Sequence, residues 1–420
     1  MPVTTEPSSR SLADWLCYLE NQHHSAIDLG LERVEKVAKQ GGLCHVNATV
    51  ITVAGTNGKG SSCALLEQIL LSQGFRVGVY SSPHIIDYRE RVRINGNSPE
   101  AEVFCRSFAA IEQLRGDTSL SYFEFGTLAA VWLLAQSQLD YLILEVGLGG
   151  RLDATNIVEP DVSVVTTVAM DHIDWLGDDL AQIGREKAGI FRPKGKVVIG
   201  DEDIVSSVLQ CSESLNCQQL AAGREYHVVK SANSWSYQGE TLCYQELPYP
   251  LLPLSNAATV LAVLEQLGLN IDPLLIQQAI SEWRLAGRLQ TISQQPLIVA
   301  DVAHNPQSAT YLASQLPKLA QGRKVFALCA MLSDKDIAAS VAPLLSLVEC
   351  WYISGLEGAR GDDGTSLAAC LAPPIKQQRF TSLTEAYQSA RRSLDEHSML
   401  IVFGSFFTVA EVLEFSSAPT

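Results

Sequence analysis

The chain lacks the features that mark several large classes of protein. Its ten cysteines form no C-x-x-C pair, so neither a zinc site nor a thioredoxin-type redox motif is indicated. No apolar run reaches the roughly 18 residues that a membrane-spanning helix needs. The opening MPVTTEPSSR has no apolar core after a basic start, so no secretory signal is expected. These absences favour a cytoplasmic protein with reduced thiols.

Charge is also scarce, and one sign dominates. Charged residues make up 18% of the 420 residues, hydrophobic residues make up 47%, and the formal net charge is −16. This composition favours a packed α/β protein and argues against non-specific binding to nucleic acid or to an anionic membrane. An acidic protein that binds an anionic nucleotide has to supply positive potential locally, from backbone N–H groups, a lysine or a metal.

The stretch VAGTNGKGSS (53–62) lacks the usual spelling of a phosphate-binding loop, G-x-x-x-x-G-K-[ST]. Val53 stands at the first glycine position, and Gly60 follows Lys59 where a hydroxyl is expected. The stretch nevertheless joins a β-branched run, predicted to be a strand, to an apolar helical pattern. A glycine-rich turn in that setting offers phosphate several N–H groups and the positive end of a helix dipole. It therefore predicts a phosphate site, with a plain strand–helix turn as the alternative.

A second glycine cluster, EVGLGGRLDATN (145–156), matches a dinucleotide-binding fingerprint only in part. The third glycine of G-x-G-x-x-G would fall at Leu152, and no helical pattern follows. A nicotinamide-dependent enzyme is therefore disfavoured.

Polar side chains stand at the ends of three predicted strands. These are the Ser81–Ser82 pair, Glu145 and His172. Functional groups of open α/β sheets gather at the carboxyl ends of strands, and Mg²⁺ prefers oxygen ligands. A hydroxyl of the serine pair, the Glu145 carboxylate and the His172 imidazole are candidate metal ligands, although a loop histidine with an ordinary protein partner is the alternative for His172. The predicted strands are 76–82, 141–147 and 162–172.

The length and the alternation of strands and helices predict two α/β domains. We expect an N-terminal P-loop-type domain with a mostly parallel sheet, followed by a C-terminal Rossmann-like α/β domain. Residues 201–250 are polar with short alternating stretches, which predicts a small antiparallel insert. We place the first domain at 1–285, a linker at 286–296 and the second domain at 297–420.

Taken together, the motifs resemble those of the Mur ligase superfamily, ATP-dependent amide-forming ligases that spell the loop G-T-N-G-K-[GT]. Within it the chain is most similar to the folylpolyglutamate synthases, in particular to the bifunctional bacterial dihydrofolate synthase/folylpolyglutamate synthases. The motifs follow the family order over nearly the whole chain, apart from 201–250. They are IDLGLERV (27–34), VAGTNGKGSS (53–62), VYSSPH (79–84), ERVRING (90–96), SYFEFGT (121–127), LEVGLGGRLDATN (144–156), DHIDWLG (171–177), IGREKAGIFR (183–192), SNAAT (255–259), AGRLQ (286–290), DVAHNP (301–306), MLSDKD (331–336) and FGSFFTVAE (403–411).

The resemblance implies a reaction in which a carboxylate, ATP and L-glutamate give an amide, ADP and phosphate. A carboxylate is a poor electrophile, so γ-phosphoryl transfer would make an acyl phosphate that the glutamate amine then attacks. The implied substrates are dihydropteroate and reduced folates, and the implied cofactors are ATP, two Mg²⁺ ions and K⁺ as a candidate monovalent cation. The first domain would bind ATP and pterin, the second glutamate, and a monomer is expected.

Roles are implied only where residues match a family motif. Lys187 matches the family's carbamylated lysine, although a lysine beside Arg185 and Glu186 on a helix is usually on a solvated face. Phe123 could stack on a pterin ring, and Glu124 could accept its N–H groups. The implied catalytic residues are Lys59, Lys187, His172 and His304; the nucleotide contacts Asn57, Gly58, Lys59, Gly60, Ser61, Asn256, Arg288 and Asp301; the metal ligands Ser82, Glu145 and His172; and the substrate contacts Asp28, Leu29, Gly30, Leu31, Ser121, Tyr122, Phe123, Glu124, Leu152, Asp153, Ala154 and Ser405.

Three alternatives stay open. A folylpolyglutamate synthase without the first activity would share most motifs, but the stretches at 27–34 and 121–127 favour the bifunctional form. Another Mur-type amino-acid ligase would lack those two stretches. A nucleotide-binding regulatory protein that has lost catalysis would be expected to have lost residues such as Lys59 and Glu145, which are intact.

Overall fold

The chain divides into two compact units. The first unit comprises the chain up to Val168 and Leu176–Trp283, and the second comprises Ala169–Trp175 and the chain from Arg284 onward. A short segment, Ala169–Trp175, therefore packs with the second unit although its neighbours in sequence belong to the first. The domain boundaries given above stay a prediction. The computed structural model describes residues 10–23, 28–358 and 360–417.

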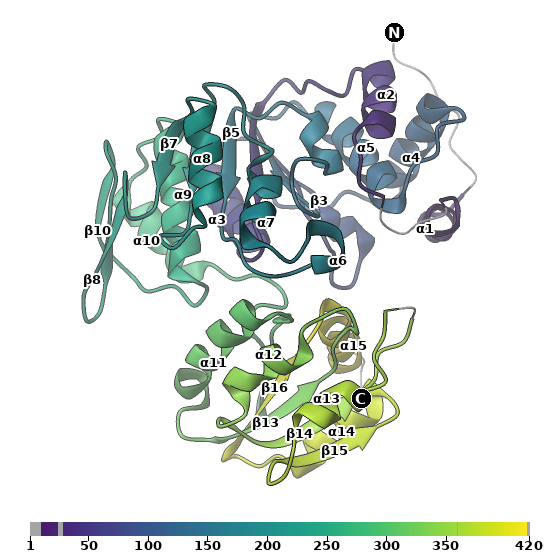
Figure 1. Ribbon diagram of the computed structural model, residues 1–420, viewed down its shortest axis with the longest axis vertical. Coiled ribbons are helices and arrows are strands. Elements are labelled where there is room, and N and C mark those ends of the chain that lie inside the picture. Colours follow the sequence, from purple (N-terminus) through teal and green to yellow (C-terminus); the bar gives the residue numbers. More distant parts are fainter. Residues whose placement is uncertain (1–9, 24–27, 359, 418–420) are drawn as a thin grey trace. The chain divides into compact units, whose positions relative to one another are not determined.

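A seven-stranded sheet organises the first unit (Figure 1). All neighbouring strands are parallel except the first two in spatial order, which are antiparallel. Parallel strands are covered on both faces, which explains why their sequences are almost continuously apolar. In spatial order the strands are β3 (Val92–Ile94), β2 (Val77–Tyr80), β4 (Tyr141–Glu145), β1 (Thr49–Ala54), β5 (Val162–Val165), β6 (Lys196–Ile199) and β7 (Gln218–Ala221).

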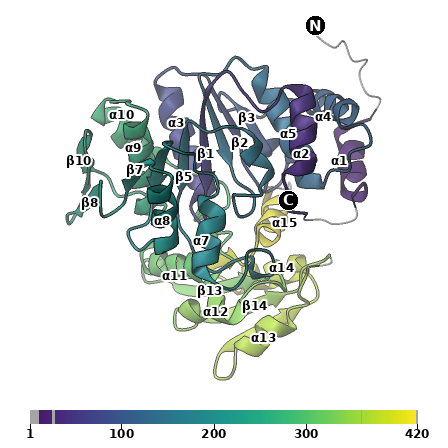
Figure 2. The ribbon, with the colours of Figure 1, turned by 45° about the horizontal axis from the view of Figure 1, so that its top comes forward.

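Helices cover this sheet (Figure 2). Helix α3 packs against β1, β2 and β4, helix α9 packs against β5 and β6, and helix α5 packs against β2. None of the described helices is both long and apolar enough to cross a membrane. The helices of this unit are α1 (Leu12–Asn21), α2 (Glu32–Gly41), α3 (Lys59–Ser72), α4 (Ala101–Arg115), α5 (Tyr122–Ala135), α7 (Leu180–Ala188), α8 (Ser206–Ser214), α9 (Leu254–Gln266) and α10 (Pro273–Glu282), with 3₁₀ turns η1 (Tyr88–Arg91) and η2 (Ala154–Ile157).

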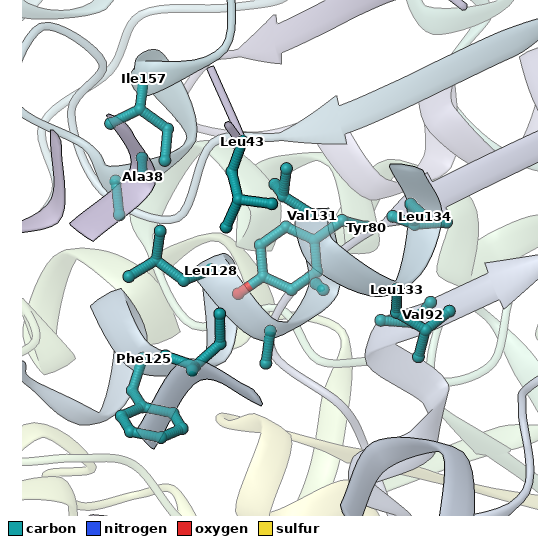
Figure 3. Close-up of a cluster of buried hydrophobic side chains, with 14 of the residues drawn as sticks. Ala38, Leu43, Tyr80, Val92, Phe125, Leu128, Val131, Leu133, Leu134 and Ile157 are labelled. Atoms are coloured by element: carbon teal, nitrogen blue, oxygen red, sulfur yellow. The ribbon is translucent and has the colours of Figure 1, made fainter. Parts of the chain in front are cut away.

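A buried apolar cluster fixes the position of α5 (Figure 3). Phe125, Leu128 and Val131 of α5 belong to it, together with Tyr80 of β2. The phenol of Tyr80 is buried, and its oxygen lies 3.0 Å from the Thr127 hydroxyl, so the ring brings no unsatisfied polar group into the core. The same packing holds the first turn of α5, where one stretch of predicted substrate contacts begins.

The predicted antiparallel insert is confirmed only for its second half. Strands β8 (His227–Lys230), β9 (Trp235–Gln238) and β10 (Cys243–Leu247) form an antiparallel sheet. The first half instead contains α8 and β7, and β7 extends the main sheet as a parallel strand beside β6. The Glu265 carboxylate of α9 anchors the insert, because it accepts hydrogen bonds from the Tyr237 hydroxyl at 2.7 Å and from the Thr241 hydroxyl at 2.8 Å.

A six-stranded sheet organises the second unit, as the Rossmann-like prediction required. Its strands are parallel except for the antiparallel edge strand β11. In spatial order they are β11 (Gln290–Gln294), β12 (Leu297–Ala300), β16 (Ser398–Phe403), β13 (Lys324–Cys329), β14 (Val348–Ser354) and β15 (Lys376–Phe380). The helices are α11 (Pro306–Ala320), α12 (Ile337–Val341), α13 (Thr365–Cys370), α14 (Leu383–Ser393) and α15 (Phe406–Ser417), with the 3₁₀ turn η3 (Ala342–Leu344).

Candidate functional site

The glycine-rich stretch forms a tight turn between β1 and α3. Helix α3 begins at Lys59, and its N-cap is Gly58 in the left-handed conformation, with φ of 89°. Gly55 has φ of 150°. Side-chain-bearing residues rarely adopt such angles, so glycine is needed at both positions. The first amides of α3 thus open onto a compact turn, the geometry expected of an anion site.

Neighbouring side chains crowd this turn. A Cβ on Gly55 would lie 1.9 Å from the Thr166 hydroxyl, and a Cβ on Gly58 would lie 2.5 Å from the Asn256 Oδ1. The Asn256 amide also donates to the Ser61 hydroxyl at 2.9 Å. The structure therefore brings together Gly58, Ser61 and Asn256, three of the predicted nucleotide contacts, although Asn256 lies far from the other two in sequence.

The Lys59 ammonium lies over the same turn. Its Nζ donates to the backbone carbonyls of Gly55 at 2.9 Å and Thr56 at 3.2 Å. Asn57 is tied to the residue that follows β5, because its carbonyl accepts from the Thr166 hydroxyl at 2.6 Å. A cation and a helix N-terminus at one turn supply the local positive potential that an acidic protein needs to bind a nucleotide.

Gly60 lies beside a buried carboxylate. A Cβ on Gly60 would lie 3.4 Å from the Glu145 Oε2, so a side chain at this position would contact that carboxylate. Glu145 ends β4 and is buried, and its Oε2 accepts from the Ser82 amide at 3.3 Å. Glycine at this position leaves the space beside Glu145 open. The loop, Glu145 and Ser82 thus meet at the carboxyl ends of β1, β4 and β2 in the first sheet.

These residues fit a magnesium-type ion. Glu145 and Ser82 offer oxygen atoms, and Mg²⁺ ordinarily takes one or two carboxylates and completes its shell with phosphate oxygens and water. Over the described ranges, no three His, Cys, Asp or Glu side chains gather as a protein-only metal cage. The donor set therefore suits an ion that arrives with a nucleotide.

His172 does not end a strand, contrary to the prediction. Strand β5 stops at Val165. The Thr166 amide still donates to the Ala54 carbonyl of β1 at 2.9 Å, and the Thr166 and Thr167 hydroxyls then bond to the Asn57 carbonyl in the turn between β1 and α3, called the phosphate turn below. His172 lies in the segment that packs with the second unit, just before the short helix α6 (Ile173–Leu176). Its backbone is left-handed, with φ of 53°. The structure thus brings Ser82 and Glu145 together and assigns His172 to the other unit.

Lys187 is buried, not on the solvated face that its sequence neighbours suggested. Its exposed fraction is 4%. It lies in the last turn of α7, whose backbone packs tightly on the glycine cluster, since a Cβ on Gly150 would lie 2.9 Å from the Lys187 carbonyl oxygen. Glu186 takes the outward position and pairs with Arg151 at 2.8 Å. A buried lysine is unusual unless it has a partner or a chemical role.

Two stretches of predicted pterin contacts meet in the first unit. The Phe123 ring lies against Gly147, where a Cβ would come within 2.4 Å of its Cζ. The Asp153 carboxylate accepts from the amides of Gly147 at 3.1 Å and Leu148 at 2.9 Å. Burial raises the pKa of Asp153 above its ordinary value, although these hydrogen bonds act in the opposite direction. Leu152 and Ala154 flank Asp153, and Tyr122 follows the Ser121 that caps α5.

The third stretch of predicted pterin contacts, residues 28–31, lies beside a network of charged side chains that the sequence did not indicate. The Arg33 guanidinium lies 2.9 Å from both Asp28 and Glu124, and the His23 ring lies 3.2 Å from Asp28. Glu124 also accepts from the Ser121 amide at 2.7 Å, so both of its oxygens have protein partners. Asp28, Leu29, Gly30 and Leu31 are all partly exposed beside this network.

In the second unit, Asp301 ties the chain before β11 to the end of β12. It accepts from the amides of Leu289 at 2.9 Å and Ala303 at 2.8 Å. Burial raises the pKa of Asp301, and the charge of Arg288 opposes that rise. The Arg288 guanidinium lies 5.1 Å from the centre of the Phe406 ring. Arg288 and Asp301, both predicted nucleotide contacts, are thus neighbours.

The two residues predicted for the glutamate side behave differently. His304 is partly exposed and is held by its Nδ1, which lies 2.8 Å from the Val302 carbonyl oxygen. Ser405 is buried and acts at the start of α15, where its oxygen accepts from the Thr408 amide at 3.0 Å. The Ser405 hydroxyl therefore caps the first turn of α15 in this structure.

Asp171 and Lys335 received no role from the sequence, although both stand in quoted motifs. Their carboxylate and ammonium lie 2.6 Å apart and are nearly buried. Burial raises the pKa of Asp171, but contact with His304 and the charges of His172 and Lys335 hold it well below its ordinary value. No periodicity or glycine pattern marks such a pair, because the two residues come from distant segments.

Comparison with known families now defines the class of protein. Residues 53–247 match the model of the Mur ligase middle domain, and residues 287–406 match that of the Mur ligase glutamate ligase domain. The fold and the site thus define a Mur-type ligase.

Individual relatives narrow the class. The chain is 45% identical to the dihydrofolate synthase/folylpolyglutamate synthase of Escherichia coli K12, over 98% of this chain and 96% of that protein. A solved Escherichia coli structure with DHPP and ADP matches with a TM-score of 0.94 at 45% identity, covering 98% and 99% of the two chains. A bifunctional enzyme solved with Mn, AMPPNP and L-glutamate matches with a TM-score of 0.91 at 47% identity, covering 98% and 99%. The chain belongs to the dihydrofolate synthase/folylpolyglutamate synthase family.

Proposed function

We propose that this chain joins L-glutamate to dihydropteroate, giving dihydrofolate, and then adds further glutamates to reduced folates by γ-linkage. Each turnover would convert ATP to ADP and phosphate. The observation that carries the proposal is the meeting of the phosphate turn, Lys59 and the buried Glu145 at one sheet edge, in a unit that also holds the predicted pterin stretches. Relatives solved with ADP, AMPPNP and L-glutamate support it.

The chemistry assigned to the residues follows from the charge that develops. Transfer of the γ-phosphoryl group to the substrate carboxylate makes an acyl phosphate, which the glutamate amine attacks. Lys59 and the amides of the phosphate turn stabilise the phosphoryl oxygens during transfer. Bound Mg²⁺ would add further positive charge there, with Ser82, Glu145 and His172 as its protein ligands. We propose two such ions, with K⁺ as a candidate further cation.

The remaining contacts are assigned by motif. Asn256, Arg288 and Asp301 bind the nucleotide, and His304 and Ser405 line the glutamate side. Lys187 is carbamylated, which would turn a buried cation into an anion beside the metal; its burial supports a role other than solvation. The pterin ring stacks on Phe123, with the stretches at 28–31, 121–124 and 152–154 around it. We further propose a monomer located where ATP and folates are available, the cytoplasm.

The decisive experiment is an assay of the purified protein with dihydropteroate, ATP and glutamate. Formation of dihydrofolate with one ADP per bond supports the proposal, and the absence of both products contradicts it. The same assay with tetrahydrofolate and glutamate separates the alternatives. A folylpolyglutamate synthase alone would extend only tetrahydrofolate, and a regulatory protein would bind nucleotide without turnover.

A further inference from the structure

The segment Ala169–Trp175 is an unusual piece of the chain. It follows β5 and precedes α7, both of the first unit, yet it packs as part of the second unit. It includes His172, for which a metal-ligand role is proposed. Because it is short and lies between elements of the other unit, its conformation needs an anchor within the second unit.

The anchor is the ion pair of Asp171 with Lys335. The Lys335 Nζ lies 2.6 Å from the Asp171 Oδ1, and the exposed fractions of the two side chains are 5% and 7%. The Asp171 Oδ2 accepts from the side-chain Nδ2 of Asn305 at 3.1 Å and lies 3.6 Å from the His304 Nε2. These three partners of Asp171 all come from the chain after residue 300, so the carboxylate joins the segment to distant parts of the second unit.

The same carboxylate reaches the backbone of His172. The Asp171 Oδ1 that faces Lys335 also accepts a hydrogen bond from the His172 amide at 2.8 Å. His172 has φ of 53°, an angle that costs energy for a residue with a side chain and persists only where the surroundings enforce it. One oxygen thus links the lysine to the strained residue, and α6 begins directly after it, with the Trp175 amide donating to the His172 carbonyl at 3.0 Å.

Lys335 itself is held by its own loop. Its amide donates to the Leu332 carbonyl at 3.2 Å, and its carbonyl accepts from the Ile337 amide at 2.9 Å. Asp336 then caps α12 by accepting from the Ala339 amide at 3.0 Å. Hydrogen bonds therefore fix the backbone that carries the Lys335 ammonium, which a residue that positions another group requires.

Stability alone is a poor explanation for this pair. Burying two charges costs about as much as their attraction returns, and apolar replacements are often neutral or stabilising. A buried pair that fixes one conformation among several has a clearer physical use. Here the conformation that is fixed is that of the His172 backbone.

We propose that Lys335 is a positioning residue that acts through Asp171 to set the orientation of His172 toward the divalent ion. The proposal rests on the metal-ligand role given to His172 under the proposed function. It adds a residue that need not touch substrate, nucleotide or metal.

The test compares Lys335→Met with wild type in the full-length protein, using Mn²⁺ and ADP as probes. We expect the Mn²⁺ affinity of the ADP complex to fall about tenfold, the usual effect of removing a group that orients a metal ligand. Affinity for ADP without metal stays unchanged. Hydrogen exchange of the His172 amide becomes faster, a readout that needs no activity.

A double-mutant cycle separates action through Asp171 from direct action. If Lys335 acts through Asp171, the variant Asp171→Asn/Lys335→Met binds Mn²⁺ no more weakly than Asp171→Asn alone. Fully additive losses, or an unchanged exchange rate at His172, overturn the proposal. Asp171→Asn is nearly isosteric, so its Mn²⁺ affinity and exchange rates give the same decision if Lys335→Met does not fold.

A matched control uses the residue next to Lys335. Asp334 forms an ion pair at 2.6 Å with Arg360 of a later segment, and this pair is more exposed. Arg360→Ala removes a charge of the same sign and should leave Mn²⁺ affinity and His172 exchange unchanged. If wild type fails the ligation assay, the proposed function fails, whereas the exchange result still decides the anchoring. If His172→Ala retains full Mn²⁺ affinity, the metal role of His172 is wrong and the proposal falls with it.

Discussion

The two units hold their candidate binding groups by different means. In the first, the phosphate turn is made of backbone: glycines with positive φ, amides at the start of α3, and a lysine tied to loop carbonyls. In the second, the Asp171 cluster is made of buried side chains from distant segments. A backbone site is sensitive to an added Cβ, whereas a charged cluster is sensitive to the loss of one charge. Variants that add a Cβ to the turn and variants that remove one buried charge should therefore affect the two sites differently.

Lys187→Ala is expected to have the largest effect, and it tests whether the first unit also depends on a buried charge. If Lys187 is carbamylated and acts beside the metal, turnover should fall by about two orders of magnitude, as when other preorganised catalytic groups are removed. Loss of the buried stem should cost about 2–5 kcal/mol of unfolding free energy, as for other long buried side chains cut back to alanine. Steady-state kinetics and urea unfolding measure the two quantities.

The control for that variant is Lys187→Met, which keeps most of the buried stem. It should be nearly as inactive as the alanine variant but more stable. Equal activity of Lys187→Ala and wild type would show that the carbamyl-lysine assignment is wrong. The candidate site of the first unit would then depend on the phosphate turn, Lys59 and Glu145 without Lys187.

Gly58→Ala comes next and tests the backbone design directly. The backbone of residue 58 is left-handed, which alanine rarely adopts, and the new Cβ would lie 2.5 Å from the Asn256 Oδ1. The turn must therefore open to accept alanine. We expect affinity for ATP to fall about tenfold or more, since strain of this kind costs on the order of 1–3 kcal/mol. Isothermal titration with a non-hydrolysable nucleotide measures it.

Gly60→Ala is the matched control in the same turn. Its φ is not positive, and its Cβ would meet only the Glu145 carboxylate at 3.4 Å. It should therefore affect the metal requirement more than nucleotide affinity. If both variants bind nucleotide equally well, the turn is more pliable than its crowding indicates.

A smaller effect should separate the two serines near the loop. The Ser61 hydroxyl donates to the Gly58 carbonyl at 3.0 Å and accepts from Asn256, so it is part of the turn. Ser82 lies beside Glu145. Ser82→Ala should raise the Mg²⁺ concentration for half-maximal activity about tenfold, the low end of the effect seen when groups of a metal site are lost. Ser61→Ala should leave that concentration unchanged, and the reverse result would return the metal to the usual loop hydroxyl.

The parts predicted well from sequence were local ones. The phosphate turn is one uninterrupted stretch between a strand and a helix, so all the residues needed to predict it are adjacent in the sequence. The β7 strand was missed because Gln218–Ala221 carries too few apolar residues to be distinguished from an insert, and only pairing with β6 defines it. Likewise, the strand predicted to end at His172 was too long: it stops at Val165, and the threonine hydroxyls that follow bond to the phosphate turn.

Buried charges were the least predictable features. Lys187 was expected on a solvated face because its neighbours are charged, but helix packing on Gly150 turns it inward. Arg33, Asp171 and Lys335 pair with residues far away in sequence, and no spacing rule links such partners. Family motifs identified the stretches that carry them, whereas the contacts required the fold.

The smallest effect is expected at the other end of the first sheet, where a charged pair has no part in a site. The Arg76 guanidinium and amide bind Asp140 at 2.8–3.2 Å, and these bonds lower the pKa of Asp140 from 3.8 to about 2. A carboxyl with a lowered pKa in the folded state stabilises the fold above its unfolded pKa, and that contribution disappears as pH falls from about 4 to about 2. Asp140→Asn should therefore flatten the dependence of unfolding on pH in that window and leave turnover unchanged, as circular dichroism and the ligation assay can measure. Superimposable pH profiles would mean that exposed pairs contribute nothing here, and that charge matters in this protein only where, as at Asp171, it is buried.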